Sequence, residues 1–230
     1  MALNLLVLGP PGAGKGTQAE RFARSREIPR ISTGDILREA VHAGTEIGLR
    51  AKAIMDRGEL VGDDVMIGIV RERLERDDAA HGFVLDGFPR TVAQAAALDG
   101  IMATRDPLII VDIVVPDHEI VRRLGSRLIC EDCGTNAPVA HGARCERCGG
   151  KLVQRADDSD EVVLERLKVY HVQSEPLVEY YRVRPTFRSI NGAQPPDQVA
   201  TELAAAIVAA GACSPSLPGL GSGARSRVQP

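Results

Sequence analysis

Residues 3–18 read LNLLVLGPPGAGKGTQ, and this stretch decides the fold. Its apolar first half is typical of a buried strand, and it opens into a glycine-rich loop that holds a single lysine. Three glycines, Gly9, Gly12 and Gly14, allow the tight turns that bring backbone N–H groups inward. The helix expected to follow adds the positive end of its dipole. The stretch therefore predicts a phosphate-binding loop, with Lys15 as an exposed point charge for the outer phosphates.

The loop differs from the common phosphate-loop pattern at one position. That pattern places Ser or Thr directly after the lysine, whereas here Gly16 stands between Lys15 and Thr17. Because its hydroxyl is displaced, we do not expect Thr17 to bind magnesium directly. A glycine-rich turn without a ligand is the alternative, but the order of strand, glycines, lysine and helix favours a phosphate site.

Composition limits the class of protein. The 230 residues are 44% hydrophobic, which suits one domain with insertions or two small domains. A net charge of -3, with 3 Tyr, 4 Phe and no Trp, argues against a nucleic-acid partner. No apolar run approaches the ~20 residues that span a bilayer, and residues 1–9 lack the features of a signal peptide. We therefore expect a cytoplasmic protein with no membrane partner.

Apolar segments alternate with helical patterns along the chain. Further strands are expected at residues 28–32, 83–86, 108–115 and 187–190. Helices are expected at residues 15–24, 36–41, 45–58, from 63 or 64 to about 76, 91–98, from 117, from 160 to 181 with a break at Pro176, and 195–207. Thr45 and Asp117 are predicted to cap the helices they precede. This alternation predicts an α/β fold, a parallel five-stranded sheet with helices on both faces and a ligand at the carboxyl ends of its strands.

Three motifs together resemble those of the adenylate kinase family, over about residues 3–207. They are GPPGAGKGTQ at 9–18, STGD at 32–35 and LDGFPR at 85–90, the last followed by Thr91 and Gln94. The resemblance implies reversible phosphoryl transfer, ATP + AMP = 2 ADP, without a covalent intermediate. It also implies a division into a core, an insert for the nucleoside monophosphate, a zinc-binding lid and a disordered tail: residues 1–31, 62–125 and 159–210; 32–61; 126–158; and 211–230.

The resemblance also implies roles for individual residues. ATP would be held by Gly12, Ala13, Gly14, Lys15, Gly16, Thr17, Arg123, Arg127 and Gln194. AMP would be held by Thr33, Arg38, Glu59, Leu60, Val61, Gly87, Phe88, Pro89, Arg90, Gln94, Arg155 and Arg166. Catalysis would fall to Lys15, Asp86, Arg90, Arg123, Arg127, Arg155 and Arg166. Chemistry agrees, because Arg38 and Arg90 offer planar forks for a monophosphate and Gln94 can both donate to and accept from an adenine edge.

Acidic residues near the motifs suggest a role for Mg²⁺, which would accompany ATP. Asp86 ends a buried strand, where it suits the orientation of magnesium-bound waters, and a cap for the following turn is the alternative. Asp157 and Asp158 also match the family pattern, and for them lid-closing hydrogen bonds and hinge structure stay equally open. Arginines alone can stabilise the moving phosphoryl group, since positioning and electrostatics suffice for phosphoryl transfer.

Four cysteines form two C-x-x-C pairs, Cys130 with Cys133 and Cys145 with Cys148, separated by eleven residues. Two such pairs suit tetrahedral binding of structural Zn²⁺, and unligated or disulfide-bonded cysteines are the alternative. The pairs resemble the metal-bearing lid of some family members, although the loop between them is shorter here. It also lacks that lid's usual aromatic, Asn and Pro-Pro stretch. Cys213 is expected to be a free thiol.

Two other functions stay open at the level of sequence. A nucleoside monophosphate kinase that prefers UMP or CMP would share most of the motifs, although Gln94 and Thr33 favour AMP. A P-loop ATPase carrying a zinc-ribbon interaction module would also contain C-x-x-C pairs. The position of the pairs between matched arginines argues against an appended module. The expected partners are thus ATP, AMP and ADP, bound by a monomer.

Overall fold

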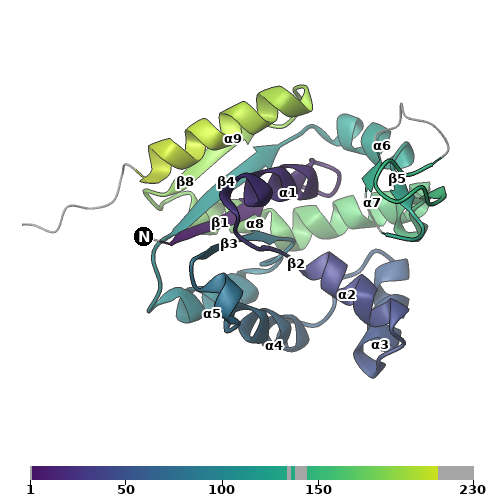
Figure 1. The fold of residues 1–230 in the computed structure, drawn as a ribbon, viewed down its shortest axis with the longest axis horizontal. Helices are drawn as coiled ribbons and strands as arrows, with labels where there is room; N and C mark the ends of the chain where they lie inside the picture. The colour runs from purple at the N-terminus through teal and green to yellow at the C-terminus, as the bar shows by residue number, and fades with distance from the viewer. Residues whose placement is uncertain (1, 134–135, 138–143, 212–230) are drawn as a thin grey trace, which may run out of the picture.

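The computed structural model describes residues 2–133, 136–137 and 144–211. A central parallel sheet is covered by helices on both faces, as the sequence predicts (Figure 1). Its strand order is β2-β3-β1-β4-β8. These strands span Arg30–Ser32, Gly82–Asp86, Leu3–Leu8, Leu108–Val114 and Phe187–Asn191, in that order.

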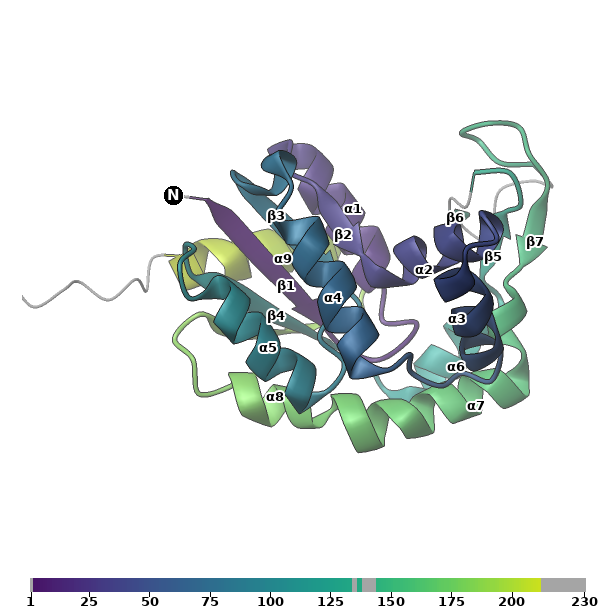
Figure 2. The same cartoon turned by 90° about the horizontal axis from the view of Figure 1, so that it is seen from below.

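The central strand β1 is buried on both sides because two separate cores meet it. Leu5 and Val7 belong to the first core, with α1 (Lys15–Arg26) and α9 (Pro196–Gly211). Leu6 and Leu8 belong to the second. That core includes side chains of α4, α5 and α8, which span Asp63–Leu74, Val92–Met102 and Pro176–Tyr181 (Figure 2). A strand so enclosed reads as a continuous apolar run.

A small helical unit follows β2. It consists of α2 (Thr33–His42) and α3 (Glu46–Asp56). The predicted cap at Thr45 is confirmed, because its hydroxyl accepts from the Gly48 N–H at 3.1 Å. The two helices approach so closely that a Cβ at Gly48 would lie 2.1 Å from the Ala40 carbonyl oxygen.

The predicted cap at Asp117 is wrong. Helix α6 spans Asp117–Gly125 and its N-cap is Pro116, which makes no side-chain cap bond. The Asp117 carboxylate instead accepts from His171 Nε2 at 2.9 Å. An acidic residue in the first helical turn still interacts favourably with the helix dipole.

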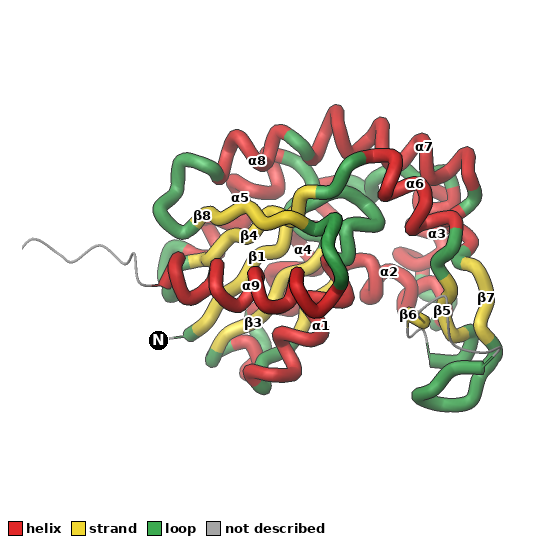
Figure 3. The backbone as a smooth tube through the Cα atoms, turned by 90° about the horizontal axis from the view of Figure 1, so that it is seen from above, coloured by secondary structure: helices red, strands yellow, loops and turns green. Residues whose placement is uncertain are grey.

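The cysteine-rich segment contains regular structure that the sequence did not predict. Three short antiparallel strands pair in the order β6-β5-β7, and this sheet stands apart from the central one at one end of the molecule (Figure 3). They span Asn136–Ala137, Leu128–Cys130 and Leu152–Gln154. A 3-10 turn, η2 (Ala156–Asp158), leads from this sheet into α7 (Asp160–Val169).

Helix α7 continues through a π-helical turn, η3 (Tyr170–Ser174), into α8. The Glu175 N–H donates to the Tyr170 carbonyl at 2.8 Å, five residues back. Pro176 opens α8 and has no N–H to donate, so the predicted break falls at the expected place. A second 3-10 turn, η1 (Asp77–Ala79), precedes β3.

Two sequence predictions fall outside the described residues. They are the disordered tail beyond Gly211 and the free thiol of Cys213. Among the helices that the structure does describe, none has the length and apolar character required to cross a membrane.

Candidate functional site

The predicted phosphate loop joins the central strand to α1. Gly9, Gly12 and Gly14 have φ values of 133°, 78° and 91°, a region that L side chains rarely adopt. A Cβ at Gly9 would also lie 2.5 Å from the Ile113 carbonyl oxygen on β4. Gly14 is the N-cap of α1, so the loop ends on the free N–H groups of a helix. This is the strand, loop and helix order that favours phosphate binding.

Lys15 is half-buried, and the expectation of an exposed charge is wrong. Its Nζ donates to the carbonyls of Gly9 and Pro10, both at 2.7 Å. Burial lowers the pKa of Lys15 to about 8, against a partial opposing effect of the Asp86 carboxylate. Neutral carbonyls thus hold the ammonium inside its own loop. Breaking these hydrogen bonds costs less free energy than breaking an ion pair with a carboxylate would.

A pocket opens at the carboxyl ends of the strands and gathers most of the residues expected to hold AMP. Those that line it are Thr33, Arg38, Glu59, Leu60, Val61, Gly87, Pro89, Arg90, Gln94, Arg155 and Arg166, and Lys15, which was expected to bind ATP, lines it as well. Five cationic side chains and only two carboxylates, Glu59 and Asp157, are in its lining. Leu37, Met55 and Met66 add apolar walls. The pocket therefore suits an anion that carries an apolar ring.

Several predicted residues do not line this pocket. They are Asp86, Phe88, Arg123, Arg127, Gln194 and, in the phosphate loop, Gly12, Ala13, Gly14, Gly16 and Thr17. Phe88 is buried in the second core at 1% exposure, so its side chain has a packing role. Arg123 donates to Glu119 at 2.8 Å and to the Gly192 carbonyl at 2.9 Å. Gln194 donates to Glu202 at 2.7 Å.

Gln94 lines the pocket and is held by two of its neighbours. Its side chain is almost fully buried, at 1% exposure. Its Oε1 accepts from the backbone N–H of Arg90 at 2.8 Å, and its Nε2 donates to Asp63 Oδ1 at 2.7 Å. The Thr91 hydroxyl donates to the other oxygen of Asp63 at 2.9 Å. Sequence reasoning missed Asp63, whose only signal is its place in the first turn of α4.

Two arginines extend the pocket. Arg38 pairs with Asp35, three residues earlier on α2. Arg90 Nε donates to the Gly87 carbonyl at 2.9 Å, and the Thr33 hydroxyl donates to the same oxygen at 2.8 Å. Both guanidinium groups therefore keep N–H donors that are not used by these partners, since each group carries five.

Asp86 is engaged by a residue that the sequence analysis overlooked. Arg30 on β2 donates to Asp86 Oδ2 at 2.8 Å and pairs with Asp35 Oδ2 at 2.9 Å. Only 8% of Asp86 is exposed, and a Cβ at Gly16 would come within 3.2 Å of its oxygen. The carboxylate thus lies directly beside the phosphate loop. The signal that could have found its partner is a charged residue at the start of a buried strand.

Three arginines cluster around two aspartates where the three-stranded sheet meets α7. Arg127 binds the two oxygens of Asp158 through two hydrogen bonds of 2.6 Å, and Arg166 adds a third at 2.9 Å. Arg155 makes a similar fork on Asp157, at 2.8 and 2.7 Å. Burial would raise the pKa of Asp157, but Arg155 and Arg166 hold it at about 2. Asp157 therefore stays ionised at neutral pH.

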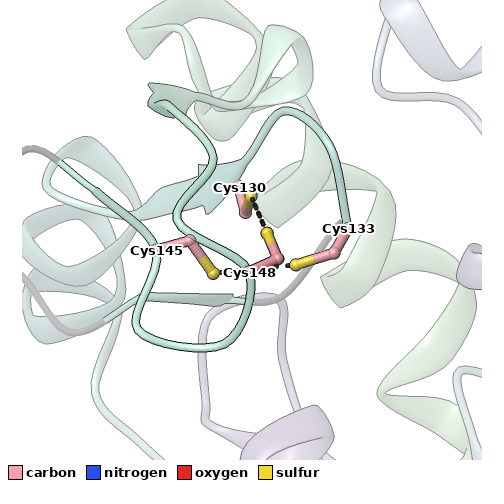
Figure 4. A group of neighbouring side chains, drawn as sticks. All are labelled: Cys130, Cys133, Cys145 and Cys148. Atoms are coloured by element: carbon pink, nitrogen blue, oxygen red, sulfur yellow. Dashed lines mark hydrogen bonds between the residues drawn. The ribbon is translucent and has the colours of Figure 1, made fainter.

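The four cysteines come together between the short strands (Figure 4). Their Sγ atoms all lie within 4.8 Å of one another. Two of the separations are 3.4 Å, Cys130 to Cys148, and 3.6 Å, Cys133 to Cys145. A tetrahedral zinc ion with bonds of about 2.3 Å would hold its sulfurs about 3.8 Å apart. The cluster therefore fits a four-coordinate metal ion, as the spacing of the pairs predicts.

Comparisons with known proteins agree with the geometry. A family model described as adenylate kinase matches residues 7–186. An adenylate kinase of Archaeoglobus fulgidus is 48% identical over 212 residues, covering 89% of this chain and 98% of that relative. One from a Geobacillus species is 49% identical over 87% of this chain and 96% of its own length. One from Rhizobium etli is 44% identical over 89% and 99%, respectively.

Proposed function

The chain belongs to the adenylate kinase family, and from this premise we propose how its residues divide the work of phosphoryl transfer. The protein is a phosphotransferase that interconverts ATP and AMP with two ADP. The observation that carries the assignment of residues is the pocket in which Lys15, Arg38, Arg90 and Gln94 meet. To bind AMP, this pocket must hold both a phosphate and a base.

AMP would occupy the pocket with its base near Gln94 and its phosphate near Arg38 and Arg90. The apolar walls suit the faces of a purine ring, and the backbone of Glu59, Leu60 and Val61, which also line the pocket, would follow its edge. The two arginines offer forked donors to a monophosphate. Thr33 and Gly87 would then line the ribose side, with Pro89 and Phe88 fixing the turn beneath.

The phosphates of ATP would rest in the loop from Gly12 to Thr17, on the N-terminal end of α1. Lys15 would leave the Gly9 and Pro10 carbonyls for the phosphate oxygens. Arg123 and Gln194 would then lie toward the adenosine of ATP. Arg123 already donates to the carbonyl of Gly192, which is on the same segment as Gln194. No covalent step is needed, because the reaction requires alignment of two phosphates and neutralisation of their charge.

Arginines of the lid region would supply that neutralisation. Arg155 and Arg166 line the pocket, and Arg127 shares Asp158 with Arg166. These guanidinium groups are paired with Asp157 and Asp158, which offsets the repulsion among the like charges. When the lid closes, the arginines would leave the aspartates and pair with the nucleotides. Asp157 and Asp158 would then serve in both roles that the sequence leaves open, lid-closing hydrogen bonds and hinge structure.

Magnesium, when bound with ATP, neutralises phosphate charge and orients its leaving group. Asp86 is the carboxylate that would serve it, through bound waters, because it is buried beside Gly16 at the phosphate loop. Arg30 would hold that carboxylate in place from the opposite side. Thr17, exposed and one residue displaced, is not assigned a role in binding the ion.

The metal of the cysteine cluster would be zinc in a structural role. Four thiolates fill a tetrahedral shell and leave no position for water or substrate. The described part of the insert has few apolar side chains, with Ile129, Leu152 and Val153 the main ones, and Val139 lies outside the described residues. Metal binding would offset the conformational entropy that is lost when the insert becomes ordered, because so small a core cannot offset it alone.

The assay that tests the assignment is formation of ADP from ATP, AMP and Mg²⁺, repeated with GMP, UMP and CMP. AMP should be the preferred acceptor. A preference for UMP or CMP would support the second reading of the sequence and would remove Gln94 from its proposed role. The cytoplasmic location, the monomeric state and the domain boundaries stay predictions, which fractionation, light scattering and limited proteolysis can test.

A further inference from the structure

We propose that Asp63 is a positioning residue that fixes the orientation of the Gln94 amide and thereby makes the pocket select adenine over hypoxanthine. The inference rests on the proposed place of the AMP base against Gln94. Asp63 itself is not among the side chains that line the pocket, so it would act through Gln94.

The two partners of Gln94 allow only one orientation of its amide. On one side stands the backbone N–H of Arg90, which can only donate, and it meets Oε1 at 2.8 Å. On the other stands the Asp63 carboxylate, which can only accept, and it meets Nε2 at 2.7 Å. A flipped amide would set donor against donor and acceptor against acceptor. At 1% exposure, the buried amide has little access to solvent that could relieve that mismatch.

Asp63 is itself held in place. Its second oxygen accepts from the Thr91 hydroxyl at 2.9 Å. That hydroxyl accepts in turn from the backbone N–H of Gln94 at 3.2 Å, as the cap of α5. The carboxylate also stands at the first position of α4, where the helix dipole favours its charge. Each polar atom of the chain from Thr91 through Asp63 to Gln94 thus has its direction determined.

The fixed amide leaves one N–H and one carbonyl lone pair of Gln94 unused. Adenine presents a matching edge, since its N6 amino group donates and its N1 accepts. Hypoxanthine presents the opposite edge, because its O6 accepts and its N1–H donates. The pocket therefore pairs with AMP and opposes IMP, two ligands of nearly the same shape. Without Asp63 only the Arg90 N–H would still oppose a flipped amide, so the pocket would accept hypoxanthine more readily.

The test compares Asp63→Ala with the parent and with Asp64→Ala. Asp64 is exposed and carries the same charge in the same helical turn, so it controls for loss of charge at the helix start. Calorimetric titration with AMP and with IMP, in the absence of ATP, gives affinities that do not depend on turnover. The parallel measurement is kcat/KM for each acceptor.

For Asp63→Ala we expect the preference for AMP over IMP to fall about tenfold or more, chiefly through KM and with little change in kcat. In Asp64→Ala the preference should stay within about twofold of the parent. An Asp63→Ala protein that keeps the parent's preference would overturn the proposal, as would an equal loss in both variants.

Two further variants keep the outcome clear. If Asp63→Ala lowers the melting temperature sharply, Asp63→Asn replaces it, because its amide has the same shape and can pair with Gln94 in either orientation. Reduced selectivity at an unchanged melting temperature supports the proposal, and full selectivity contradicts it. Gln94→Leu separates the inference from its premise. If Gln94→Leu loses AMP affinity while the Asp63 variants keep the parent's preference for AMP over IMP, only the orienting role fails; if Gln94→Leu binds AMP normally, the proposed site of the base is wrong.

Discussion

The ammonium of Lys15 can bind either the carbonyls of its own loop or the phosphates of a nucleotide. In the structure its ammonium rests on the carbonyls of Gly9 and Pro10, at 2.7 Å from each, inside the phosphate loop. Neutral carbonyls hold a cation less strongly than a phosphate does, so the residue is prepared to move to a nucleotide. Loss of the side chain would leave those carbonyls near solvent and would remove no packing from either core.

Lys15→Ala should therefore reduce kcat/KM for ATP by about 10² or more, while the melting temperature changes little. Lys168→Ala is the matched control, because Lys168 is a surface lysine on α7 that pairs only loosely with Glu165, at 3.4 Å. The assay of ADP formation measures kcat/KM, and a thermal melt measures the melting temperature. Activity of Lys15→Ala within tenfold of the parent would contradict the role of this residue.

The same lysine gives the protein a pH dependence. Burial lowers the pKa of Lys15 to about 8, so in the free protein its positive charge is lost as the pH rises through that value. ATP affinity should hold steady up to about pH 8 and then weaken by about tenfold per pH unit. Calorimetric titration with ATP between pH 6 and 10 measures it.

Lys15→Arg provides the comparison, because a guanidinium keeps its charge throughout this range. Its ATP affinity, whatever its absolute value, should not fall above pH 8. A parent protein whose affinity stays flat to pH 9.5, or an arginine variant that weakens in parallel, would show that another group is responsible.

At the scale of an element, we expect the three-stranded sheet to depend on a metal ion held by the four cysteines. Its strands are only two or three residues long, and a sheet of that size has little stability of its own. Removal of the ion, by a strong chelator or by Cys130→Ser, should lower the melting temperature by several degrees. The central sheet and activity at low temperature should survive. Cys213→Ser, which removes the fifth cysteine, should change neither the melting temperature nor the activity.

Elemental analysis beside the thermal melt completes this test. One zinc per chain with a chelator-sensitive melt is the expected result. A metal-free protein whose melt is indifferent to chelator would show that the four thiols do not serve as a metal site.

The elements also show which features a sequence can predict. Long amphipathic helices and apolar strands, such as β4, have periodicity, and the phosphate loop and the C-x-x-C pairs have spacing. All of these follow from neighbours along the chain. The strands β5, β6 and β7 are too short to show a period, and the pairing of β5 with β7 joins residues more than twenty positions apart, such as Leu128 with Gln154. The exposure of Lys15 was misjudged because its own loop encloses it.

The candidate site divides in the same way. Residues within a motif, such as Arg90 and Gln94, could be found from their spacing. Their partners could not, because Arg30 reaches Asp86 from another strand and Asp63 reaches Gln94 from another helix. Such contacts become visible only after the parallel order of the sheet brings these segments to one edge.

At the scale of the whole molecule, both inserts leave the core at the edge where the pocket lies. We expect residues 32–61 and 126–158 to close over bound nucleotides, because a site open to water would hydrolyse ATP. Hydrogen exchange with a bisubstrate analogue should show stronger protection in both segments, and no change in β1 and β4. Unchanged exchange in both inserts would mean that the protein binds its substrates without closing.

The pairing of β5 with β7 places the entry and the exit of the lid side by side, with Leu128 opposite Gln154. The segment between them can therefore gain or lose residues while the core keeps its geometry. An insert whose ends meet in this way can vary in length without moving Arg127 and Arg155, which lie on its two flanks. A lid transplanted from a relative with a longer loop, joined at these two positions, should give an active hybrid.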